Sequence, residues 1–259
     1  MKKIAALIIL IVIAVFALSA CNEGTTLSSC WADKETIVYD VKKDDAHIGT
    51  LTTVLERFPS DKTLAGETYS KASSKLTITY AGDGSTMSVT ALLDNFAPLA
   101  VVKTYTGTNG NYTVESRYSG KYYNYKLTQN GSVTEDRIKV SGAYMDNELI
   151  YTYLRCDDIS QLSTTLRIPS ALTGNAQGLS VQTKGKAEVT TGAGTISCYE
   201  VLISKEDAPV GKSIKVFYAE ASEDNKVKGG LSSQYDSSKY PVRIEENDLV
   251  YVLKSITAA

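Results

Sequence analysis

Few side chains in this 259-residue sequence are suited to bond-making chemistry. The one histidine, His47, follows two aspartates in a predicted turn, and no G-x-S-x-G motif accompanies it, so a histidine-based triad is not supported. Paired carboxylates, which glycosidases use, occur at Asp157–Asp158, at Glu206–Asp207 and among Glu245, Glu246 and Asp248. Because loop acids are usually solvated, we expect a protein that is not an enzyme, with a carboxylate-based hydrolase as the alternative.

The sequence also lacks the usual motifs for metals and cofactors. A single histidine excludes H-E-x-x-H, and the four cysteines include no C-x-x-C spacing, so a zinc site has no support. No glycine-rich phosphate loop or EF-hand loop is present. We therefore expect no metal and no cofactor. The formal charge of −2, without a basic excess, also argues against nucleic acid as a partner.

Cys21 is the residue whose surroundings favour a covalent modification. Two lysines precede the apolar run from Ile4 to Ala17, and Leu18-Ser19-Ala20-Cys21 closes this segment. The tetrad resembles the bacterial lipobox. This resemblance implies cleavage after Ala20, a diacylglycerol group on the Cys21 thiol and further fatty acylation, for example by palmitate. The alternative is an uncleaved anchor, for which the run is barely long enough.

Both interpretations tether the protein to a bacterial membrane outside the cytoplasm, and they leave open whether this is the inner or the outer membrane. We expect residues 1–20 to form the signal peptide, residues 21–34 a polar tether and residues 35–259 a single domain. Loss of Lys2 and Lys3 changes the formal charge from −2 to −4. Trp31, the only tryptophan, is expected to dock on the domain edge, with contact to the bilayer as the alternative.

The other cysteines are Cys30, Cys156 and Cys198. An odd number allows at most one internal pair, and disulfides are permitted outside the cytoplasm. We take Cys156–Cys198 as the candidate disulfide, because both residues lie in the expected domain. Three reduced thiols are the alternative.

Most of the sequence has the pattern of β-strands. Apolar and polar residues alternate with a period of two in segments such as 37–42, 76–80, 86–91 and 112–118. Asn109-Gly110, Ser119-Gly120 and Asn130-Gly131 supply the turn residues of tight hairpins. The spacing of about ten residues predicts an antiparallel meander.

One segment, Asp146 to Arg155, has a helical pattern instead. A helix here places Leu149, Ile150, Tyr153 and Leu154 on one side, and Asp146 or Asn147 can cap its first N–H groups. A second, weaker helical or irregular stretch is expected from Glu56 to Thr68.

Three sequence phrases resemble a known family. They are Tyr39-Asp40-Val41 with Ile48-Gly49-Thr50, then Thr191 to Tyr199, and then Lys239-Tyr240-Pro241-Val242-Arg243-Ile244-Glu245. In order and spacing they resemble the domain-of-unknown-function family 3108, which is similar in fold to the lipoprotein carrier LolA and its receptor LolB. The resemblance implies a mainly β (α+β) fold, in which an antiparallel sheet curls into a half-barrel and one or two helices cover its concave face.

This fold suggests a binding protein. A lipid or other hydrophobic ligand would lie between sheet and helix. Leu149, Ile150, Tyr153 and Leu154 are the candidates for covering the concave face, and the sequence does not identify the residues that contact the ligand. The alternative is a structural or adaptor lipoprotein that binds an envelope protein or polysaccharide. A soluble shuttle is disfavoured by Cys21, because a lipid-anchored protein stays at one membrane.

Overall fold

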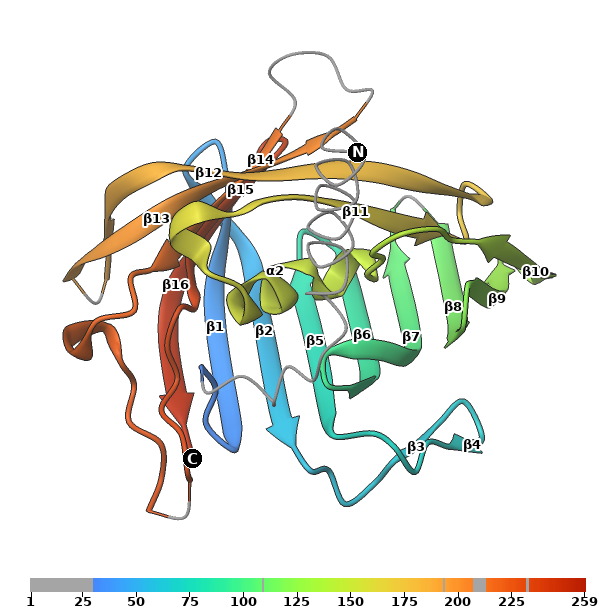
Figure 1. The fold of residues 1–259 in the computed structure, drawn as a ribbon. Coiled ribbons are helices and arrows are strands. Elements are labelled where there is room, and N and C mark those ends of the chain that lie inside the picture. The colour runs from blue at the N-terminus through green and yellow to red at the C-terminus, as the bar shows by residue number, and fades with distance from the viewer. Residues whose placement is uncertain (1–29, 109, 193, 207–212, 232) are drawn as a thin grey trace, which may run out of the picture.

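A computed structural model describes residues 30–108, 110–192, 194–206, 213–231 and 233–259 (Figure 1). Among these residues, fourteen strands form one antiparallel sheet and two short strands form a separate hairpin. The predicted fold class, a curled antiparallel sheet with a helical cover, is confirmed. The strands are β1 (Lys34–Lys43), β2 (Ala46–Arg57), β3 (Thr63–Leu64), β4 (Glu67–Thr68), β5 (Ser74–Gly82), β6 (Ser85–Asp94), β7 (Ala97–Gly107), β8 (Gly110–Ser119), β9 (Tyr122–Gln129), β10 (Ser132–Lys139), β11 (Ser163–Ser170), β12 (Asn175–Thr191), β13 (Gly194–Lys205), β14 (Ser213–Ala219), β15 (Pro241–Glu246) and β16 (Leu249–Ala258).

The sheet consists of two meanders that meet where the chain begins and ends. Its order is β10-β9-β8-β7-β6-β5-β2-β1-β16-β15-β14-β13-β12-β11. The first and last strands therefore pair at its middle, with Glu35 opposite Ala258 and Lys43 opposite Leu249. The strands of the two halves curve toward each other, so that β10 and β11, the two ends of the sheet, lie on the same side of the molecule (Figure 1).

The predicted helix connects the two halves. It consists of a 3-10 turn η1 (Asn147–Leu149), the helix α2 (Ile150–Tyr153) and a second 3-10 turn η2 (Leu154–Cys156), followed by η3 (Ile159–Gln161). Asp146 is the N-cap, and its side chain accepts a hydrogen bond from the N–H of Glu148. The segment crosses the concave side of the sheet (Figure 1).

A second helical or irregular stretch was expected from Glu56 to Thr68, and the helical alternative is wrong. Strand β2 continues to Arg57, and the hairpin β3–β4 follows. The strand is longer than predicted because Leu55 and Arg57 still face the interior, at 2% and 6% exposure. The polar sequence after Phe58 then forms only the two-residue strands of this small hairpin.

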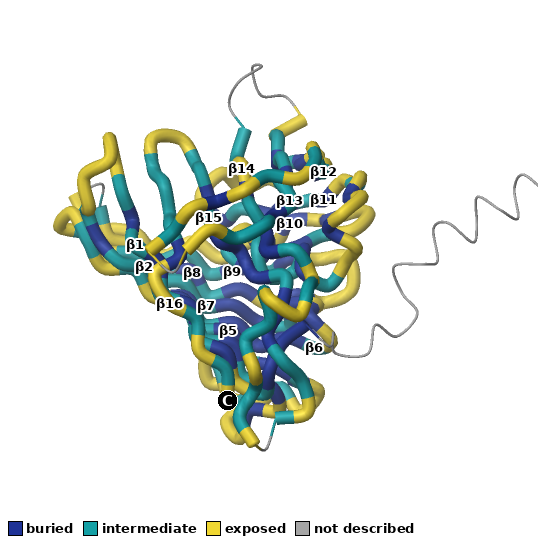
Figure 2. Tube along the Cα trace, turned by 90° about the vertical axis from the view of Figure 1, so that its left-hand side faces the viewer, coloured by how far each residue is buried: buried dark blue, intermediate teal, exposed yellow. Residues whose placement is uncertain are grey.

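The core lies inside the curled sheet, where buried positions gather along the strands (Figure 2). Strand β1 alternates buried and half-buried residues from Glu35 to Lys42, as the period of two predicts. Tyr123 and Tyr125 are buried in the main cluster, whereas Tyr122 is exposed and stacks under Arg137. Pro241 begins β15, where its missing N–H is tolerated.

Candidate functional site

A cleft of about 960 Å³ opens inside the concavity, between the two halves of the sheet. Strands β7 and β8 supply one wall, β11 to β14 supply the other, and the start of η1 lies between them. Glu246 at the end of β15 also lines the cleft, as do Asn247 and Asp248 in the turn that follows. Ligand-binding clefts commonly have volumes of about 300–1,000 Å³, so this space is large enough for a small lipid-like molecule.

The floor of the cleft is apolar because the inward-facing positions of neighbouring strands converge there. These positions alternate along each strand, so Leu179 of β12 and Ile203 of β13 both face inward. The apolar lining includes Val114, Ile168, Ala171, Leu179, Ile203 and Ile214. Leu172, which is 52% exposed, lies at the opening.

A group of charged residues lies at the wall formed by β7 and the helical segment. Lys103 contacts Asp146 at 2.8 Å and Glu148 at 3.5 Å. Burial would lower the pKa of Lys103, but Asp146 and Glu148 raise it above its ordinary value, so the ammonium stays charged. The Tyr118 hydroxyl donates to Asp146 at 2.9 Å. The Asp146 carboxylate thus has two roles: it caps the helical segment and it compensates the charge of Lys103.

Glu148 and Glu246 line both this cleft and a smaller cavity of about 80 Å³ between the helical segment and β1, β2 and β5. The hydroxyl of Tyr151 donates to Glu246 at 3.2 Å. Burial raises the pKa of Glu246, with a smaller contribution from Glu148 in the same direction. The wall between the two cavities therefore carries two carboxylates, one of them largely removed from water.

The predicted cover residues occupy the core rather than these cavities. Leu149, Ile150 and Leu154 are at most 2% exposed, and Tyr153 packs against the same cluster. The residues of this segment that line a cavity are polar: Asn147, Glu148, Tyr151, Thr152 and Arg155. The amphipathic pattern correctly predicted that one face of the helix is buried. It could not predict that the polar face lines a cavity, because no sequence pattern distinguishes such a face from one exposed to solvent.

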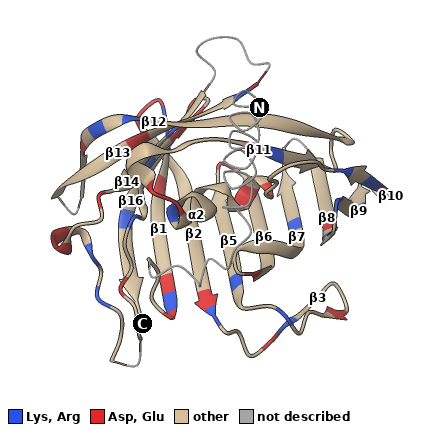
Figure 3. Cartoon of the chain, viewed as in Figure 1, with Lys and Arg blue, Asp and Glu red and all other residues tan. Residues whose placement is uncertain are grey.

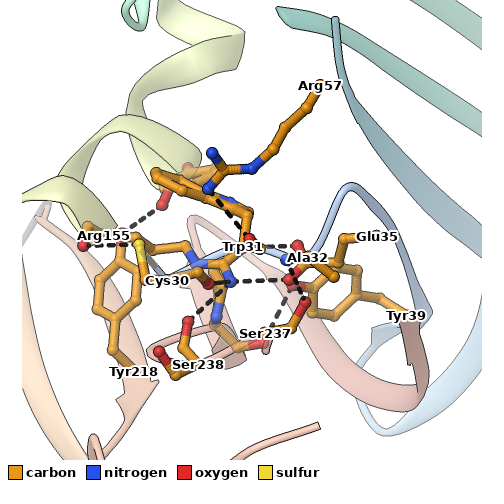
Figure 4. Close-up of polar contacts among 12 residues, drawn as sticks. Cys30, Trp31, Ala32, Glu35, Tyr39, Arg57, Arg155, Tyr218, Ser237 and Ser238 are labelled. Carbon is orange, nitrogen blue, oxygen red and sulfur yellow. Dashed lines mark hydrogen bonds and ion pairs between the residues drawn. The ribbon is translucent and has the colours of Figure 1, made fainter. Parts of the chain in front are cut away.

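Below the helical segment, the beginning of the described chain is locked into the fold by a group that we call the N-terminal clamp: Cys30, Trp31, Glu35, Arg57 and Arg155 (Figure 4). Trp31 is 0% exposed and stacks on Phe96 with ring centroids 4.2 Å apart. The guanidinium of Arg155 lies 5.0 Å from the Trp31 ring and also donates to the Cys30 carbonyl at 3.1 Å. Arg57 donates to the Trp31 carbonyl at 3.0 Å.

The clamp places Trp31 docked in the domain, in agreement with the favoured sequence interpretation. Cys30 and Trp31, which precede the expected domain start at residue 35, are packed into the core. Cys21 and the signal peptide lie outside the described residues.

The predicted Cys156–Cys198 disulfide is not formed: both residues are free thiols in the structure. Cys156 packs against the main hydrophobic cluster, whereas Cys198 belongs to a second cluster around Tyr39 and Val242. Burial raises the pKa of both thiols, that of Cys198 to about 12. Neither thiol therefore has the character of a reactive thiolate.

The other chemical candidates from the sequence are mostly surface groups. His47 is exposed beside Asp40, at 3.5 Å. Asp158 caps η3, Glu206 pairs with Arg167, Glu245 with Arg243, and Asp248 with Lys43. Asp157 follows η2, and Asp207 lies outside the described residues. Of the acids singled out in the sequence, Glu246 and Asp248 line the cleft, and Glu148 joins them there.

Charged residues of both signs are spread over strand ends and loops, without a large region of one sign in the view of Figure 3. Within the described part of the chain, no group of three metal-ligating acids, cysteines or histidines comes together. None of the helices in that part is long and apolar enough to span a membrane.

Residues 38–250 match the family described as "Protein of unknown function (DUF3108)", and the chain belongs to this family. The predicted family is thereby confirmed. No curated protein matches the sequence.

Two solved structures are similar to this chain. One is a beta-barrel-like protein of domain of unknown function DUF1849 from Brucella abortus, with 9% identity and a TM-score of 0.52, over 88% of this chain and 99% of that one. Its likeness supports the barrel-like fold. The other is a "putative lipoprotein" from Parabacteroides distasonis, with 12% identity and a TM-score of 0.29, over 87% of this chain and 95% of that one.

Proposed function

We propose that this protein is an extracytoplasmic lipoprotein, anchored through Cys21, that binds a lipid or another ligand with a hydrocarbon chain in the 960 Å³ cleft. The observation that carries the proposal is the converging apolar floor of that cleft, formed by β8, β11, β12, β13 and β14. A sheet of this curvature has a concave apolar face that must be covered, and here α2 covers only part of it.

The lining supports a ligand with a chain and a polar end. A hydrocarbon chain in contact with Val114, Leu179 and Ile203 leaves water, which stabilises the complex by about 0.8 kcal/mol for each fully buried methylene. Lys103 and Glu148 offer polar atoms at the adjoining wall. The lining also holds other polar side chains, among them Asn147, Gln177 and Lys205. Polar groups placed beside an apolar floor can orient one end of a ligand.

Binding can be measured by native mass spectrometry and by displacement of a fluorescent fatty-acid probe from the intact protein. We expect uptake of offered lipid, and we expect affinity to rise with chain length by up to about fourfold per methylene until the cleft is filled. The proposal is contradicted if the measured mass is that of the lipoprotein alone with every lipid offered and the protein takes up no probe.

Two variants locate the site. Leu172→Arg places a charge at the exposed opening, and Ile214→Arg places one in the half-buried lining. Both are expected to weaken probe binding at least tenfold. Val133→Arg is the matched control, because Val133 is 57% exposed on β10 and lies outside the cleft lining. Equal affinity in all three variants contradicts this location.

The anchor has its own test. Labelled palmitate is expected to enter the wild-type protein in cells and to be absent from Cys21→Ala. Incorporation that persists in Cys21→Ala, or that is missing from both proteins, contradicts the lipid attachment.

A further inference from the structure

We propose that the end of the domain that carries Phe58 and Leu231 rests on the lipid bilayer, so that the cleft opens on the side facing away from the membrane. This inference rests on the proposed anchoring at Cys21 and goes beyond it, because an anchored domain could otherwise adopt any orientation. Two independent features support it: the place where the chain enters the fold, and the position of two exposed apolar side chains.

The distance between the anchor and the fold is short. Eight residues separate Cys21 from Cys30, and an extended chain spans at most about 3.5 Å per residue. Cys30 therefore lies within about 30 Å of the acylated cysteine, whatever conformation the connection adopts. A domain of about 230 residues has a diameter of about 45 Å, from a radius of gyration near 17 Å. The connection is too short to reach around the domain.

The chain enters at one defined end of the sheet. The N–H of Arg57, at the end of β2, donates to the Asp33 carbonyl at 2.8 Å, and the N–H of Lys34 donates to the carbonyl of the last residue, Ala259, at 2.9 Å. The start of β1, the end of β2 and the end of β16 therefore form this end of the domain, which is the lower end in Figure 1.

Phe58 and Leu231 flank this point. Phe58 directly follows Arg57 and is 68% exposed. Its φ of 47° lies in the left-handed region, which bulky residues avoid, so the backbone turns this ring outward at the cost of strain. Leu231 is fully exposed. It follows Gly230, where an added Cβ lies 3.2 Å from the Ala259 backbone, and Ser233 two residues later accepts from the N–H of Asp33 at 3.1 Å.

The cleft lies toward the other end. Its lining includes the exposed Asp248, which pairs with Lys43 at the far end of β1. Strand β1 has ten residues, which corresponds to about 33 Å at 3.3 Å per residue. This exposed part of the lining and the point of chain entrance are thus separated by about the length of β1. Exposed aromatic and aliphatic side chains beside a short lipid anchor fit the apolar boundary of a bilayer.

Tryptophan scanning in the complete, lipid-modified protein tests this orientation. The native Trp31 is fully buried and provides a constant background. Phe58→Trp and Leu231→Trp report on the proposed membrane side. His47→Trp, at the opposite end of the β1–β2 hairpin, and Val133→Trp on β10 are exposed controls that lie outside the cleft lining. Each protein is reconstituted into phosphatidylethanolamine–phosphatidylglycerol vesicles with and without doxyl-labelled phospholipid, and flotation measures anchoring separately.

We expect blue-shifted, doxyl-quenched emission for the variants at positions 58 and 231, and unquenched emission for those at 47 and 133. Protein that floats while 58 and 231 remain unquenched overturns the orientation but leaves the anchor and the ligand site in place. Equal or stronger quenching at 47 and 133 overturns it in favour of another orientation of the domain. Protein that does not float contradicts the anchoring and, with it, the docking.

Discussion

Arg155 and Glu35 form a two-point ion pair in which Nη1 lies 2.6 Å from Oε1 and Nη2 lies 2.8 Å from Oε2. Their side chains are 1% and 3% exposed. Glu35 raises the pKa of Arg155 against the lowering effect of burial, and Nη2 also donates to the Ser238 carbonyl at 2.8 Å. One guanidinium thereby joins the helical segment, the first strand and the segment that precedes β15.

Removal of one partner of this pair is expected to destabilise the protein strongly. Arg155→Met leaves the Glu35 carboxylate buried without its cation, and the expected loss is about 3–5 kcal/mol in the free energy of unfolding. The double variant Arg155→Met/Glu35→Leu should lose much less than the sum of the single variants. Urea denaturation of the four proteins measures the coupling. Arg117→Ala is the surface control: its pair with Glu67 is about half exposed, so the loss should stay below about 1 kcal/mol.

Trp31→Ala is expected to cost about 3–5 kcal/mol, because a fully buried indole stacked on Phe96 is replaced by a cavity. Limited proteolysis should then cut near residue 30 before it cuts the sheet. Phe58→Ala, 27 residues further along at an exposed position, should change stability by no more than about 0.5 kcal/mol in the absence of membrane. Similar small losses in both variants contradict a structural role for the docked segment.

Glu246 is expected to make stability depend on pH. Burial holds its pKa in the folded protein above the ordinary value of 4.5, so the folded state binds this proton more tightly than the unfolded state. The resulting stabilisation is present below that value and is lost as pH rises through the folded pKa. Glu246→Gln can still accept from Tyr151, and relative to wild type it should gain stability as pH rises from about 4.5 until the folded pKa is passed.

Denaturation midpoints between pH 3 and pH 8 measure this difference. Glu220→Gln is the control of opposite sign: the hydrogen bond from Lys186 lowers the pKa of Glu220, so the stabilisation that it provides is lost only as pH falls below about 4.5. Parallel curves for wild type and Glu246→Gln contradict the prediction.

Gly49 permits a close approach between β2 and β5. An added Cβ lies 2.5 Å from the Ala81 carbonyl oxygen and 2.7 Å from the Cα of Gly82, and these are backbone atoms that cannot turn away. Gly49→Ala should therefore cost about 1–3 kcal/mol. Gly192→Ala, which meets open space, is the matched control and should be neutral within about 0.5 kcal/mol. Thermal unfolding of the two variants makes the comparison.

The local features of the fold could be predicted, because they depend on neighbours in the sequence. Alternation predicted the strands, Asn130-Gly131 predicted a hairpin, and the helical segment begins at the predicted cap, Asp146. Gly49 belongs to Ile48-Gly49-Thr50, one of the segments that resemble the family. The structure explains why a glycine stands there: the β5 backbone leaves no room for a Cβ. By contrast, Glu35 and Arg155 are 120 residues apart, and neither residue's local pattern indicates a buried partner.

The sequence could predict a hydrophobic site inside a curled sheet, but not the residues that line it. Its floor combines side chains from β8 and from β11 to β14, which the curvature of the sheet brings together. The position of Glu246 shows the same limit. In sequence it resembles its solvated neighbours Glu245 and Asp248, and only the packing of Tyr151 and Glu148 around it distinguishes it.

The pairing of β1 with β16 has a consequence for how the molecule is made. These two strands are joined by more than 200 residues of intervening chain, so closing the middle of the sheet carries the largest loop entropy of any contact in the fold. Each meander can assemble locally during synthesis, but the two cannot be joined before β16 has been made. The protein is thus held as two unfinished halves until this strand is available.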